Sequence, residues 1–178
     1  MLTNEKIAAI HANAVAHGFW EAGNEPTFGE YCALIHEEIS EAFSAWRNGE
    51  PDEYVDDNGK PEGVWVELAD VVIRCADLLG VLKQGMEPWS DSIYSKVVDY
   101  MRALNEEKFA EYISMLHDFV TKAHESASNN LLNVYIVIEY IITCIYAMAD
   151  ARNIDLDAII DRKCAYNATR PWRHGKRM

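Results

Sequence analysis

The sequence has few signals for β-structure. No run of alternating polar and apolar residues is bounded by the Asn-Gly or Asp-Gly turns that mark a hairpin. Apolar residues instead recur every three or four positions along most of the chain, which is typical of helices. We therefore expect an all-α protein, a helical bundle extended by an inserted helical hairpin.

Metal-binding motifs of cysteine and histidine are also missing. The four cysteines form no Cys-x-x-Cys pair, which argues against a zinc ribbon or a thioredoxin-like site. None of the six histidines follows a Glu or Asp by three residues, and this argues against a di-iron carboxylate bundle built on Glu-x-x-His. We expect the cysteines to be reduced, mostly buried thiols in a cytoplasmic protein.

Positive charge is scarce. The chain has 16 Lys and Arg against 29 Asp and Glu, and its net charge is −13. Phosphate backbones repel such a protein, so we expect no nucleic acid polymer as a partner, whereas a small nucleotide needs only a local basic site. Residues 1–10 have no apolar core segment, and a signal peptide is not expected there.

A long uninterrupted apolar run is lacking as well. The most apolar stretch, Leu131 to Ala149, is interrupted by Asn133, Glu139 and Thr143. A glutamate at the centre of a bilayer costs about 2–3 kcal/mol or more, so we expect a buried helix of a soluble protein and no membrane contact. Its later polar positions lie along one stripe, and its apolar remainder must be covered by this chain or by a second copy. We expect a homodimer or a higher homo-oligomer.

Seven helices are predicted from the apolar periodicity and from breaks at Gly, Pro and Asn-Gly. Their ranges are 3–20, 28–47, 64–84, 90–104, 106–126, 130–152 and 155–167. Residues 50–63 are predicted to form a polar loop, and residues 170–178 a basic, irregular tail. The length suits one domain over residues 1–178 with a sizeable core.

Two carboxylates lie at one edge of the second predicted helix. At about 100° per residue, Glu38 projects at the border of the apolar face, and Glu41 lies just beyond it, one turn along. Glu37 points further toward the polar side. One such pair is common on a solvated helix surface and indicates little by itself.

The third predicted helix is apolar nearly all round and should be buried. Glu67, Asp70, Arg74 and Asp77 interrupt it in one narrow charged stripe. Arg74 can pair with Asp70 or Asp77, which leaves Glu67 facing the carboxylates of the second helix. Buried carboxylates are expected to be paired or to bind metal, and ligands that are all oxygen suit Mg²⁺ or Mn²⁺ better than zinc.

Basic residues gather at the C-terminal end. Residues 162–178 contain six of the 16 Lys and Arg and no acid. This concentration indicates either a local anion-binding site or a basic helix end that complements the helix dipole.

Four segments resemble the MazG-like all-alpha nucleotide pyrophosphohydrolases. The run His36 to Glu41 resembles the EExxE motif of that family, and Glu67 to Asp70 resembles its ExxD motif. The segment Lys163 to Lys176 is similar to a K-xx-YN-xx-RP-xx-HGK pattern, and His11 to Trp20 is similar to a recurring first-helix pattern. The chain departs from compact members by an insertion over about residues 81–152.

The resemblance implies metal-dependent hydrolysis of a nucleoside triphosphate to the monophosphate and pyrophosphate. It implies a Mg²⁺ site, with Mn²⁺ as an alternative, formed by Glu38, Glu41, Glu67 and Asp70. Water activation is assigned to Glu37 or Glu41. The residues implied in substrate binding are Lys163, Tyr166, Asn167 and Arg170. Trp20 or Trp46 would be available to stack on the base, although we expect core packing for both.

Two alternatives stay open. One is a dUTPase- or dCTPase-like hydrolase with a narrower base specificity. The other is a non-catalytic helical binding module that keeps the acidic site without turnover.

Overall fold

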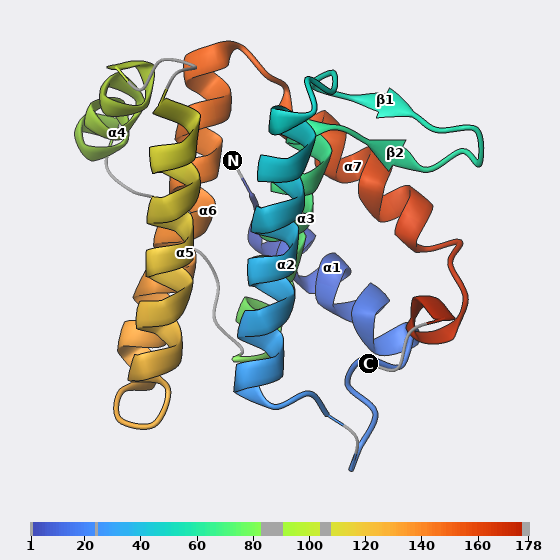
Figure 1. Ribbon diagram of the computed structural model, residues 1–178. Helices are drawn as coiled ribbons and strands as arrows, with labels where there is room; N and C mark the ends of the chain where they lie inside the picture. Colours follow the sequence, from blue (N-terminus) through green and yellow to red (C-terminus); the bar gives the residue numbers. More distant parts are fainter. Residues whose placement is uncertain (1, 24, 83–90, 104–107, 176–178) are drawn as a thin grey trace.

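Helices make up nearly all of the regular structure in the computed structural model (Figure 1). The structure describes residues 2–23, 25–82, 91–103 and 108–175. Its elements are α1 (Asn4–Ala16), α2 (Phe28–Arg47), β1 (Tyr54–Val55), β2 (Pro61–Glu62), α3 (Val64–Val81), α4 (Asp91–Ala103), α5 (Phe109–Ser126), α6 (Leu131–Arg152), α7 (Leu156–Asn167) and the 3₁₀ turn η2 (Trp172–Gly175). The prediction of an all-α helical bundle is confirmed.

Side-chain caps set the starts of several helices. Thr27 and Glu30 form a reciprocal capping box at the start of α2, and Asn130 and Asp155 cap α6 and α7. The first helix is shorter than predicted. It ends at Ala16, because the chain turns at Gly18, whose φ of 81° lies in the left-handed region.

The predicted loop over residues 50–63 contains a small antiparallel hairpin that was not predicted from the sequence. Tyr54 pairs with Glu62 and Val55 with Pro61. Each strand is only two residues long, so no alternation is visible in the sequence, although an Asn-Gly pair occupies the turn.

The helix α3 lies at the centre of the fold. It contacts α2, α1, α7 and α6, and its side chains are buried on almost every face. The helices α5 and α6 pack against each other on the side of α2 opposite α7, and α4 packs on α6 (Figure 1). One face of the α2–α3 pair is therefore covered by α5 and α6, while α1 and α7 cover α3 on the other.

The helix α6 is long and apolar enough to cross a membrane, but its second half is buried within this protein. The polar stripe expected on its surface is mostly buried too. Glu139, Thr143 and Tyr146 are buried, and only Asp150 is exposed. The apolar residues left on the surface lie instead at the start of the helix, at Leu131, Leu132 and Ile136.

Candidate functional site

Three carboxylates meet where α2 packs against α3. Glu38 comes from α2, and Glu67 and Asp70 come from consecutive turns of α3. One carboxylate oxygen from each lies within 4.8 Å of the others. The site predicted from the sequence had four carboxylates; the structure brings three of them together, and Glu41 is not in this group.

Burial and mutual repulsion make it costly to ionise the carboxylates of this cluster together. Glu38 and Glu67 are buried. Burial, together with the charge of Asp70, raises the pKa of Glu38 to about 7 and that of Glu67 to about 9. Within the described part of the chain, Glu67 Oε2 has no hydrogen-bond partner. A buried carboxylate oxygen without a partner is costly, and a bound cation would satisfy it.

These donors fit a hard divalent cation. All three ligand atoms are carboxylate oxygens, which Mg²⁺ and Mn²⁺ prefer and zinc does not. Mutual repulsion and the unpartnered Glu67 oxygen both favour a cation at this point. The residues present therefore fit the ion that the motif implies.

Two fixed cations border the cluster. Lys163 Nζ, on a side chain that is 2% exposed, lies 2.7 Å from Asp70 Oδ2. Arg74 Nε and Nη2 each lie 3.1 Å from Glu38 Oε1. The prediction that Arg74 pairs with Asp70 or Asp77 along its own helix is wrong, since its ion pair with Glu38 crosses from α3 to α2.

Asp77 is engaged elsewhere, which explains why Arg74 turns to α2. The Tyr31 hydroxyl donates to Asp77 Oδ2 at 2.5 Å, and Trp20 Nε1 lies 3.0 Å from each oxygen. His11 Nδ1 lies 2.7 Å from Oδ1. This network ties α1 and α2 to the far end of α3.

Glu38 and Asp70 of the cluster line a cavity of about 270 Å³, whereas Glu67 is not among its lining residues. Its polar lining residues are Asn13, Glu38, Glu41, Lys60, Asp70, Arg74, Asp77, Lys163, Asn167 and Arg170. Its apolar lining is Ile10, Ala14, Phe19, Leu34, Ile73 and Cys164. One space thus joins acidic, basic and apolar walls, as a ligand with a charged part and an apolar part requires.

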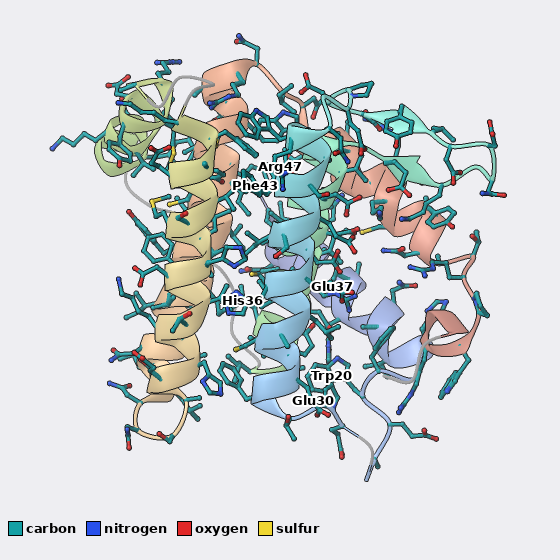
Figure 2. All side chains as sticks on the ribbon, viewed as in Figure 1. Trp20, Glu30, His36, Glu37, Phe43 and Arg47 are labelled. Carbon is teal, nitrogen blue, oxygen red and sulfur yellow. The ribbon has the colours of Figure 1, made fainter. Side chains whose placement is uncertain are left out.

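The remaining predicted carboxylates differ in position. Glu41 lines the cavity beside the cluster. After burial and the charge of Asp70, its charge also raises the pKa of Glu38, whereas Arg74 lowers that pKa. Glu37 is exposed and is not among the cavity-lining residues. Figure 2 shows Glu37 on the side of α2 away from α5, whereas His36 points toward α5. Of the two residues considered for water activation, the cavity contains Glu41.

Three of the four predicted substrate-binding residues also line the cavity. They are Lys163, Asn167 and Arg170, which follow one another along α7 and its end. Asn167 is buried, and its Oδ1 has no hydrogen-bond partner among the described residues. Tyr166 is half-buried and lies outside the cavity lining.

The first part of the basic tail is ordered rather than irregular. The turn η2 docks against the segment after α1, where the Arg173 backbone N–H donates to the His17 carbonyl at 2.9 Å. Arg173 Nε donates to the Gly18 carbonyl at 3.1 Å, and the Trp172 ring occupies the space that a side chain at residue 18 would need. Residues 176–178 lie outside the described residues.

The two candidate tryptophans pack against the core, as expected. Trp20 is held by Asp77, with its ring 5.3 Å from that of Tyr31. Trp46 packs on Phe109 of α5, at 5.3 Å between ring centroids. Neither is among the cavity-lining residues.

Sequence reasoning missed one charged residue of the cavity, Lys60, which the β-hairpin supplies. Its only signal in the sequence is a lysine beside an Asn-Gly turn between the two carboxylate motifs.

Comparison of the chain with protein-family models, with curated proteins and with solved structures found no match. The resemblance to MazG-like proteins stays a prediction that depends on the motifs.

Proposed function

We propose that this protein is a magnesium-dependent nucleotide pyrophosphohydrolase with a MazG-like arrangement of its site. The observation that carries the proposal is the cluster of Glu38, Glu67 and Asp70, whose Glu67 Oε2 lacks a partner among the described residues. The cavity that Glu38 and Asp70 line also contains the cations and the amide that a polyphosphate requires, Lys163, Arg170 and Asn167.

Glu38, Glu67 and Asp70, with Glu41 beside them, would hold the Mg²⁺. The ion supplies charge neutralisation at the phosphate oxygens and lowers the pKa of a bound water. The Glu41 carboxylate faces the cavity and would accept a proton from the attacking water.

The other walls bind and orient the nucleotide. Arg170 and Asn167 donate to phosphate oxygens, and Lys163 keeps Asp70 in position through their 2.7 Å ion pair. The apolar wall, which includes Ile10, Phe19 and Leu34, receives the base and excludes water from it.

A panel of ribo- and deoxynucleoside triphosphates, incubated with Mg²⁺, tests this function. We expect equal amounts of monophosphate and pyrophosphate, separated by ion-exchange chromatography, and no product when a chelator is added. Release of diphosphate and orthophosphate would contradict the proposal. Turnover of a single pyrimidine nucleotide would favour the dUTPase- or dCTPase-like alternative, and binding without turnover would favour the non-catalytic module.

A further inference from the structure

The β-hairpin between the two carboxylate motifs places Lys60 in the cavity. The proposed function gives this charged group no role. Lys60 follows the turn and lines the cavity together with Glu38, Asp70 and Arg170. Its side chain is 32% exposed, so it is accessible from solvent, unlike Lys163.

The turn fixes the backbone of Lys60. Asp56 Oδ1 accepts hydrogen bonds from the backbone N–H groups of Asn58 and Lys60, both at 2.8 Å. The Asp56 N–H donates to the Lys60 carbonyl at 2.9 Å. An aspartate that bonds to its own turn in this way organises the loop before any ligand arrives.

The hairpin is also anchored to the helices that form the cavity. Arg162 of α7 forms two bonds of 2.5 Å with the carboxylate of Glu53, and Lys163 Nζ donates to the Pro61 carbonyl at 3.4 Å. At its other end, Gly63 has a φ of 120°, and a Cβ there would lie 2.7 Å from the Pro51 carbonyl oxygen. The hairpin is therefore held against both α7 and the start of α3.

The Lys60 ammonium pairs with Glu62 and still has N–H donors available for a ligand. Its Nζ lies 2.6 Å from Glu62 Oε1, two residues along the chain. An ammonium has three N–H donors, and this contact uses one of them. The charges of Glu67 and Asp70 also act on the Lys60 ammonium, but without the direct ion pairs that Lys163 forms with Asp70 and Arg74 with Glu38.

We propose that Lys60 is a further substrate-binding residue, which contacts the phosphate oxygens of the nucleotide from the hairpin side of the cavity. This inference rests on the proposed function. Lys60 and Arg170 lie in the same cavity lining but come from segments far apart in the sequence, so the polyphosphate would be bound between the hairpin and the end of α7.

The experiment compares Lys60→Ala and Lys60→Arg with Lys122→Ala. The control lysine forms an exposed ion pair with Asp118 on α5, outside the cavity. The Michaelis constant and the turnover number are measured for a nucleotide that the parent hydrolyses. The dissociation constant of inorganic pyrophosphate with Mg²⁺ is measured by calorimetry, and thermal unfolding is followed for each variant.

Lys60→Ala should raise both the Michaelis constant and the pyrophosphate dissociation constant about tenfold or more, which is the value of one charge-assisted hydrogen bond. Turnover at saturation and the unfolding temperature should stay near those of the parent. Lys60→Arg should restore most of the affinity, and Lys122→Ala should behave as the parent.

Unchanged constants in Lys60→Ala would overturn the inference and leave Lys60 as a partner of Glu62 alone. A parent that binds pyrophosphate through Lys60 but hydrolyses no nucleotide would overturn the proposed function and keep the anion site. A parent that neither binds nor hydrolyses would overturn both.

Discussion

Glu67 is the residue on which the metal assignment depends most directly. Burial and the charge of Asp70 raise the pKa of its carboxyl to about 9, so the folded protein favours the protonated form that the unfolded chain loses near pH 4.5. Folding therefore has to neutralise this group, and that requirement lowers stability in the absence of metal.

Glu67→Gln should abolish Mg²⁺-dependent turnover and should raise the stability of the metal-free protein at pH 8. The amide is neutral without taking up a proton on folding, and it keeps the shape of the carboxyl. Thermal unfolding with a chelator measures the stability, and pyrophosphate release measures turnover. A marked loss of metal-free stability would instead indicate a structural role for Glu67.

Lys163 is a buried cation paired with Asp70, and its substitution tests how far this pair stabilises the fold. Lys163→Met removes the cation from a buried pair and leaves Asp70 uncompensated, so the protein should lose about 3 kcal/mol of unfolding free energy. Lys6→Met breaks an ion pair between α1 and α7 whose aspartate, Asp161, is largely exposed, and it should change stability little. Urea unfolding of both variants checks this. Equal losses would mean that the burial of Lys163 does not strengthen its pair.

At the level of elements, the seam between α2 and α5 contains a pair of histidines. His36 and His117 stack at 5.0 Å between ring centroids, and their Nδ1 atoms lie 2.8 Å apart. Burial lowers the pKa of both, helped by the charge of His124 for His36 and of His36 for His117. Both are therefore harder to protonate in the folded protein than in the unfolded chain.

This pair predicts a loss of stability in mild acid. Each folded pKa is lower than the unfolded value of 6.5, so the stabilising contribution is complete above 6.5 and is lost as the pH falls through the folded values. The unfolding temperature should fall between about pH 7.5 and pH 5, and less steeply in His117→Gln. Identical slopes in parent and variant would show that the seam does not titrate.

The elements were predictable where local chemistry specifies them. The bounds of α2 follow from the Thr27–Glu30 capping box and from the Asn48-Gly49 break, and both ends were predicted. The hairpin was not predicted, because its two-residue strands are too short to show an alternation of polar and apolar residues. The contact between Arg74 and Glu38 was missed for another reason. Spacing along one helix shows which residues share a face, but not which neighbour lies across from that face.

At the scale of the whole molecule, the first turns of α6 leave an apolar surface uncovered. Leu131, Leu132 and Ile136 are 63%, 64% and 50% exposed, although the second half of the helix is buried within the chain. Clusters of exposed apolar side chains commonly mark contacts between proteins. We propose this surface as the contact through which the homo-oligomer expected from the sequence would form.

We predict a homodimer at micromolar concentration that is weakened by Leu132→Lys with Ile136→Lys. Two charges placed in an apolar contact would remain unpaired when it forms. Light scattering measures the mass of each species. Val55→Lys, at an equally exposed apolar residue on the hairpin, is the control, and dissociation by that variant alone would place the contact elsewhere.

The position of Lys163 late in the chain has a consequence for synthesis on the ribosome. The acidic cluster can assemble once α2 and α3 have emerged, but its buried ammonium follows only after α4, α5 and α6. Chains begin to fold from the N-terminal end as they are made. Until α7 emerges, the negative charge of the three carboxylates must be neutralised by Arg74, by protons or by a bound divalent ion. A metal ion would then assist folding during synthesis, before any substrate binds.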